Sequence, residues 1–224
     1  RGPPGVTRDT LITKYRPRTL DEFRYNPDVV ALVRSLLAMD TLNVLFIGDS
    51  GTGKSCLVRA IIQEYYSGEA GSDNVLTITN LRDQGISYYR TDVKTFCQTA
   101  STHPGRKKIV VLDDLDCIYE QSQQVFRNCM DKYSHNVLFL ATCTNAQKVI
   151  DSIQSRLTLV RLRAFAAAEL RGMMECICTK EGISIADDAA DFTVAVCNNS
   201  IRTLINYLEK FILVDSHIDL ATAT

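Results

Sequence analysis

A glycine-rich run at Gly48 to Ser55 could bind the phosphates of a nucleotide, because it has the spacing Gly-x-x-x-x-Gly-Lys-Ser. Glycine lets the backbone bend until successive N–H groups surround an anion. In such a loop Lys54 reaches the outer phosphates and the Ser55 hydroxyl can bind Mg²⁺. We therefore predict a site for ATP or ADP with Mg²⁺. The expected lining residues are Gly48, Asp49, Ser50, Gly51, Thr52, Gly53, Lys54, Ser55 and Cys56.

The segments on either side of this run support that interpretation. The apolar stretch 44–47 has the pattern of a buried strand, and the residues from Cys56 onward have the pattern of a helix. A helix that begins there would point the positive end of its dipole at the phosphates. A glycine-rich turn without a ligand is the alternative, which the agreement of strand, loop and helix disfavours.

Two acidic residues follow a second apolar strand at 109–112. A carboxylate at Asp113 could bind the metal, and one at Asp114 could orient or deprotonate the attacking water. A pair of acids after a strand is otherwise typical of a solvated turn. The preceding phosphate loop favours the metal site.

The last expected strand, 137–142, is followed within three residues by Thr144 and Asn145. Ligands of a parallel sheet bind at the carboxyl ends of its strands, so either side chain could contact a phosphate or water. Thr and Asn also cap helices. The residues leave both interpretations open.

Short apolar runs alternate with helical patterns, which predicts an α/β domain with a doubly wound parallel sheet at 28–162. Residues 1–27 form a polar leader, and residues 163–224 are expected to form a small all-helical lid domain. The expected strands are 43–47, 75–79, 108–112 and 137–142, and the expected helices are 28–39, 54–66, 86–100, 121–133, 166–180, 187–197 and 200–214.

The composition excludes some classes of protein. A net charge of -1 gives no general signal for nucleic acid or membrane binding, so any DNA contact must come from a local group of cations. No apolar stretch approaches the roughly 18 residues of a membrane span. The eight cysteines lie mostly in apolar runs, which predicts small core residues in a reducing compartment inside the cell.

The order of the motifs resembles that of the small subunits of replication factor C, which are sliding-clamp loaders within the AAA+ ATPases. The resemblance extends from about residue 10 to about residue 219. It depends on segments 14–21, 48–55, 83–86, 113–116, 153–156 and 200–202. Clamp loaders carry a helical collar after these two domains, and the sequence stops at Thr224 without one.

The resemblance implies roles around the nucleotide. Thr144 or Asn145 would be a first sensor of the phosphates, and Arg202 a second sensor. Arg156 would be an arginine finger that reaches the ATP of a neighbouring subunit, so hydrolysis would require assembly. The residues that would line the adenine pocket are Tyr15, Arg16 and Pro17.

The resemblance also implies macromolecular contacts. Cations on helices that line a central chamber would follow the DNA backbone, although a solvated helix face has the same pattern. Ile118 and Tyr119 would contact the ring-shaped clamp, although core packing is equally compatible with them. The candidate DNA-binding residues are Arg82, Arg90, Lys94 and Arg127.

The expected function is that of an ATPase subunit in a hetero-oligomeric clamp loader acting on primer-template DNA, in the nucleus if the source is eukaryotic. The family usually has Glu where Asp114 stands, so a nucleotide-bound scaffold that hydrolyses ATP weakly is an alternative. An origin-binding or helicase-loading AAA+ protein is another, which the Lys14–Pro17 segment disfavours. A nucleoside kinase would have no use for Ser155 and Arg156.

Overall fold

The computed structural model describes residues 10–23, 25–68, 73–79, 89–214 and 218–220. Contacts within the chain separate two compact units. One is formed by Pro17–Arg163, and the other by the residues up to Arg16 together with those from Ala164 onward.

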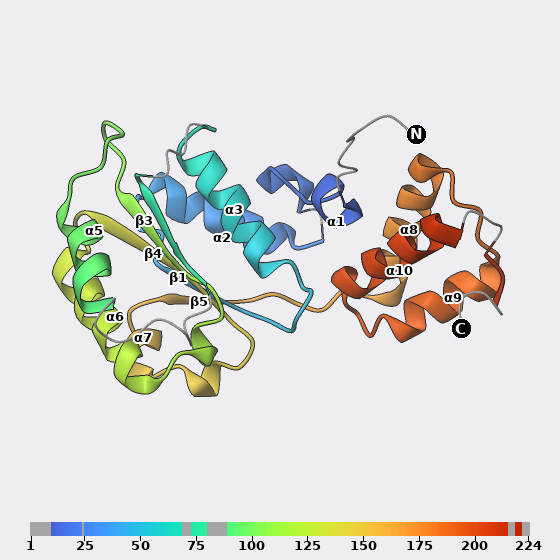
Figure 1. Cartoon of the computed structure of the whole chain (residues 1–224). Helices are drawn as coiled ribbons and strands as arrows, with labels where there is room; N and C mark the ends of the chain where they lie inside the picture. Colours follow the sequence, from blue (N-terminus) through green and yellow to red (C-terminus); the bar gives the residue numbers. More distant parts are fainter. Residues whose placement is uncertain (1–9, 24, 69–72, 80–88, 215–217, 221–224) are drawn as a thin grey trace, which may run out of the picture. The chain divides into compact units, whose positions relative to one another are not determined.

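The first unit is built on a five-stranded sheet in the order β2-β3-β4-β1-β5, with every described pair parallel (Figure 1). Four strands confirm the expectation from the sequence. β5 was not predicted, because only one of its four residues is buried and it therefore has no apolar run. The strands are β1 (Val44–Ile47), β2 (Val75–Ile78), β3 (Lys108–Leu112), β4 (Val137–Cys143) and β5 (Thr158–Arg161).

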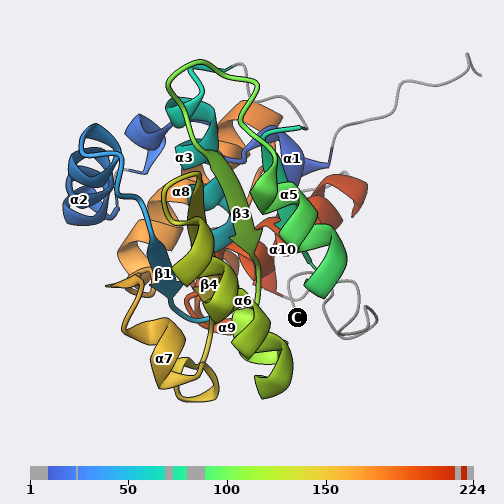
Figure 2. The same ribbon diagram turned by 90° about the vertical axis from the view of Figure 1, so that its left-hand side faces the viewer.

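Helices cover both faces of this sheet. Val44 and Phe46 belong to the core beneath α2 (Pro27–Ala38) and α3 (Lys54–Tyr65). The alternate residues of β1 face the other core, which α5 (Lys94–Gln98), α6 (Glu120–Tyr133) and α7 (Asp151–Gln154) cover. These three helices lie in front of the strands in Figure 2. The doubly wound α/β fold expected from the sequence is therefore confirmed.

Several short elements were not predicted. The expected helix 86–100 begins, within the described residues, as a π-helix, η2 (Tyr89–Val93), that continues into α5. The 3₁₀ helices are η1 (Leu20–Glu22), η3 (Leu115–Cys117) and η4 (Ala146–Lys148). Leu20 is fully buried, so part of the leader belongs to the core of the α/β unit.

The second unit contains α8 (Ala167–Glu181), α9 (Asp187–Val196) and α10 (Ile201–Val214), as expected, together with α1 (Leu11–Lys14). α1 packs against α10, and the Leu11 amide donates to the Glu209 carboxylate at 2.6 Å. Four residues are too few to show a helical period, so α1 could not be predicted. Within the described residues, no helix is both long and apolar enough to cross a membrane.

The cysteines only partly follow the expectation that they are core residues. Cys117 and Cys176 are exposed and Cys56 is half-buried. An apolar run in the sequence does not determine whether the cysteine within it faces the core or the solvent. The buried cysteines are Cys97, Cys129, Cys143, Cys178 and Cys197.

Phe126→Ala is expected to destabilise the α/β unit by about 3–5 kcal/mol, because it leaves a cavity between α6 and the sheet. Phe126 is fully buried in that core. Hydrogen-exchange mass spectrometry should show faster exchange in β4 peptides. Gln124→Ala, at an exposed position of α6, is the control, and equal exchange in the two variants would contradict the prediction.

Candidate nucleotide-binding site

The loop Gly48 to Ser55 joins β1 to α3 at the carboxyl end of the sheet. Gly51 and Gly53 have φ values of 84° and 91°, in the left-handed region that favours glycine. A Cβ on Gly48 would lie 3.0 Å from Thr52 Oγ1 and 3.1 Å from the Leu162 carbonyl oxygen. The backbone path of this loop therefore depends on its glycines, as a phosphate-binding loop requires.

Lys54 lies inside the loop and is only 7% exposed. Its ammonium group donates to the carbonyl oxygens of Gly48, at 2.6 Å, and Asp49, at 2.9 Å. Burial lowers the pKa of Lys54, and nearby carboxylates, led by Asp114 and then Asp116, oppose that shift. The Asp49 side chain is exposed. The loop thus places a buried cation where phosphates would lie.

Asp113, at the end of β3, joins three segments of the site. The Ser55 hydroxyl donates to its two carboxylate oxygens at 3.1 and 3.2 Å. The Thr142 hydroxyl, on β4, donates to Oδ1 at 2.6 Å. Thr142 was missed in the sequence, although it is a polar residue in an apolar strand and is fully buried.

Ser55 and Asp113 fit the ligand set that Mg²⁺ takes beside a nucleotide. Mg²⁺ commonly uses one or two protein oxygens and completes its shell with water and phosphate oxygens. In the described part of the chain, no cluster of three His, Cys, Asp or Glu residues could hold a metal by itself. The binding of Mg²⁺ with a nucleotide at Ser55 and Asp113 stays a prediction.

Asp114 follows in a left-handed conformation, with φ 54°. Its amide donates to Thr142 Oγ1 at 3.0 Å, so Thr142 orients both acidic residues of the pair. Asp114 is exposed, and among the nearby carboxylates its negative charge raises the pKa of Lys54 the most. The structure thus brings Lys54, Ser55, Asp113 and Asp114 together.

Asp116 fixes the turn after β4. Its Oδ2 accepts from the amides of Thr144, at 3.1 Å, and Asn145, at 2.9 Å. The Asn145 side-chain oxygen accepts from the Gln147 amide and caps η4. Asn145 therefore caps a helix, which is one of the two interpretations that the sequence left open. The sensor role of Thr144, whose side chain is exposed, or of the Asn145 side-chain nitrogen stays a prediction. Asp116 was also missed, because its partners lie far along the chain, in the turn after β4.

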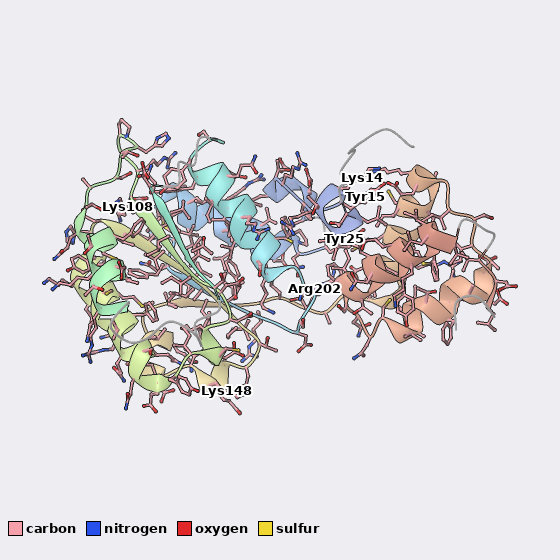
Figure 3. The ribbon with its side chains drawn as sticks, viewed as in Figure 1. Lys14, Tyr15, Tyr25, Lys108, Lys148 and Arg202 are labelled. Atoms are coloured by element: carbon pink, nitrogen blue, oxygen red, sulfur yellow. The ribbon has the colours of Figure 1, made fainter. Side chains whose placement is uncertain are left out.

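The leader residues Lys14 and Tyr15 interact within the helical unit (Figure 3). The Lys14 ammonium lies 2.6 Å from a Glu181 carboxylate oxygen, and the Tyr15 hydroxyl donates to the same carboxylate. Burial and this hydrogen bond raise the pKa of Tyr15 to about 12. Arg16 and Pro17 are half-buried. In the α/β unit, a Cβ on Gly53 would lie 3.9 Å from the Phe23 ring, a neighbour of the loop that the sequence did not indicate.

The two arginines expected to sense or complete a nucleotide site occupy different units. Arg202 is exposed at the start of α10. Arg156 follows α7, and its Nε and Nη2 donate to the two oxygens of Asp131 at 2.5 and 3.1 Å. Its Nη1 donates to the Ser152 carbonyl oxygen at 2.5 Å.

The residues expected to contact DNA lie on η2, α5 and α6. Arg90 and Lys94 are exposed, Arg127 is half-buried, and Arg82 lies outside the described residues. The clamp-contact prediction needs a correction: Ile118 is 6% exposed, because it packs in the core beside η3, whereas Tyr119 is 75% exposed.

The family model for "ATPase family associated with various cellular activities (AAA)" matches residues 44–164, which include the phosphate loop, the acidic pair and the turn after β4. The chain belongs to this AAA family. Membership implies ATP binding and suggests ATPase activity. The AAA core of the chain is its five-stranded sheet with the flanking helices.

The chain is also similar to proteins named replication factor C small subunit. It is 27% identical to the one from Methanosarcina barkeri over 98% of this chain, and 30% identical to the one from Natronomonas pharaonis over 96%. It spans 66% of the length of each. The Thermotoga maritima RuvB Holliday junction branch migration motor has a similar fold, with a TM-score of 0.70 and 15% identity over 93% of this chain and 70% of RuvB.

Thr142→Val is expected to lower the Mg²⁺-dependent part of nucleotide affinity by about tenfold, since it removes the hydroxyl that orients Asp113 and satisfies the Asp114 amide. The measurement is a titration with fluorescent mant-ADP in Mg²⁺ and in EDTA. Thr142→Ser keeps the hydroxyl and should retain the parent affinity. An equal loss in EDTA, or no loss in Mg²⁺, would contradict this role of Thr142.

Proposed function

We propose that this chain is an ATP-binding subunit of a DNA sliding-clamp loader, which uses ATP binding and hydrolysis to open a clamp and load it on primed DNA. The order of the motifs from Lys14 to Arg202 supports this proposal. So do the relatives named replication factor C small subunit, which align with 90–98% of this chain. Other subunits of the loader, the clamp and primer-template DNA would be its partners, inside the cell and in the nucleus if the source is eukaryotic.

The chemistry proposed for the phosphates and the metal uses residues of the α/β unit that lie together at the carboxyl ends of the strands. Lys54 would neutralise charge on the outer phosphates, and Ser55 and Asp113 would hold Mg²⁺. Bound Mg²⁺ supplies electrostatic stabilisation of the phosphate oxygens. Asp114 would orient or deprotonate the attacking water. Thr144 or Asn145 and Arg202 would sense the phosphates, and Tyr15, Arg16 and Pro17 would line the adenine.

The position of Arg156 carries the proposal that hydrolysis requires a second subunit. Arg156 is bound to Asp131 of α6 and to Ser152 of α7. Both helices pack on the face of the sheet opposite α3, which begins at Lys54 of the phosphate loop. The guanidinium group is thus anchored away from the helix that would bind this chain's own nucleotide, and remains 32% exposed. An arginine supplied in trans stabilises the transferring phosphoryl group.

The macromolecular contacts are proposed on exposed side chains. Arg90, Lys94 and Arg127 would contact DNA phosphates without reading the bases. Tyr119 would be the apolar anchor for the clamp, because a large exposed aromatic side chain is favoured at the centre of an interface. Arg82 keeps its proposed DNA contact on sequence grounds.

Asp114 favours a second possibility, a scaffold subunit that hydrolyses ATP slowly. Its side chain is one methylene shorter than the Glu usual in the resembling family. A displaced carboxylate can slow a reaction by about a hundredfold.

ATP turnover should be slow for the purified chain alone and at least about a hundredfold faster after assembly with its clamp-loader partners, primed DNA and clamp. Arg156→Ala should reduce turnover in the assembly, whereas Arg59→Ala, at an exposed position of α3, should not. Full turnover by the isolated chain would contradict the proposed role of Arg156. Unchanged turnover in Asp114→Asn would favour the scaffold.

A further inference from the structure

Two arginines with different proposed partners share one carboxylate, that of Asp131. Arg156 binds both of its oxygens through Nε and Nη2. Arg127, one turn earlier on α6, places Nη1 at 3.6 Å from Asp131 Oδ2. The oxygen that accepts from Arg156 Nη2 is therefore also the one nearest to Arg127.

The two arginines hold this carboxylate unequally. Arg156 makes a two-pronged interaction, which is the strong arrangement for a guanidinium and a carboxylate. Arg127 is loosely held: its Nη2 donates to the neighbouring Asn128 at 2.8 Å, and its buried Nε has no hydrogen-bond partner among the described residues. The Arg127 side chain is 33% exposed and its ion pair with Asp131 is long, so a phosphate oxygen can compete with Asp131 for Nη1.

We infer that Asp131 is a positioning residue that holds Arg156 in place for a neighbouring nucleotide and links Arg156 to DNA through Arg127. The inference rests on the proposed clamp-loader function. Because two cations compete for one carboxylate, a DNA phosphate that engages Arg127 leaves Asp131 to Arg156 alone. DNA contact at α6 therefore strengthens the hold on Arg156, and DNA stimulation of ATP turnover passes through this carboxylate.

The surrounding charges agree with this arrangement. Hydrogen bonding with Arg156 lowers the pKa of Asp131, so the carboxylate is charged at neutral pH. The side chains of Arg127, Asp131 and Arg156 are 32–46% exposed, so they are accessible to a phosphate or a neighbouring subunit.

The link can be tested on the isolated chain by NMR of the arginine Nε–H groups, with a short duplex DNA titrated at low salt. The Arg156 Nε–H signal should shift on DNA addition in the parent chain and stay fixed in Arg127→Ala. Asp131→Asn should displace that signal before DNA is added. The inference would be overturned if DNA did not shift the Arg156 Nε–H signal in the parent, or if DNA shifted it equally in Arg127→Ala.

In the assembled loader, the readout is the ratio of ATP turnover with and without primed DNA. Asp131→Asn should reduce this ratio to less than half of the parent value, with nucleotide affinity unchanged, and Asp131→Glu should restore part of it. Asp151→Asn removes an exposed acid on α7 and should keep the parent ratio. If Asp131→Asn keeps the parent ratio of turnover with and without DNA, the inferred role of Asp131 is rejected and the proposed function is not affected.

If instead the parent shows no DNA stimulation, or Arg156→Ala keeps full turnover, the proposed clamp-loader function is contradicted.

Discussion

The hydrogen bonds to the Asp113 carboxylate are the interaction on which the candidate site depends. They join the first turn of α3, through Ser55, to β4, through Thr142, across the end of β3. Parallel strands make this possible, because β1, β3 and β4 all end at one edge of the sheet, where Gly48 bonds back to Cys143 at 3.2 Å. The apolar cores on both faces fix the three strands in register, and so fix the distance between the phosphate loop and the acidic pair.

The charged side chains at the carboxyl ends of the strands differ in how far they are engaged in hydrogen bonds within the protein. Lys54 is buried, and its hydrogen bonds to two loop carbonyls partly offset the cost of burial. The Asp113 carboxylate accepts hydrogen bonds from two hydroxyl groups. Asp116 accepts the amides of the turn after β4 with Oδ2, and its Oδ1 is buried without a hydrogen-bond partner among the described residues. Asp114 is exposed, so its carboxylate is accessible to water.

Local patterns predicted the elements of the fold and the loop, and tertiary contacts account for what they missed. Gly48 to Ser55 was identifiable because one short segment contains all of its chemistry. β5 was missed because one buried residue makes no pattern. For Ile118 the sequence left clamp contact and core packing open, because an apolar residue after a turn can face either way, and the structure places it in the core. Thr142, Asp116 and Asp131 act on residues 25 to 29 positions away, so no spacing rule indicates them.

The most direct measurement is the binding of Mn²⁺, a substitute for Mg²⁺, to the chain with ADP, followed by electron paramagnetic resonance. We predict one bound Mn²⁺ in the parent, a loss in Asp113→Asn, and a weakening of about tenfold in Ser55→Ala, because the first substitution removes a negative charge and one carboxylate oxygen and the second removes the hydroxyl ligand. ADP binding measured in the same samples should persist without the metal, through the loop amides and Lys54. Equal Mn²⁺ binding by the parent and Asp113→Asn would contradict the assignment of Asp113 and Ser55 as the metal ligands.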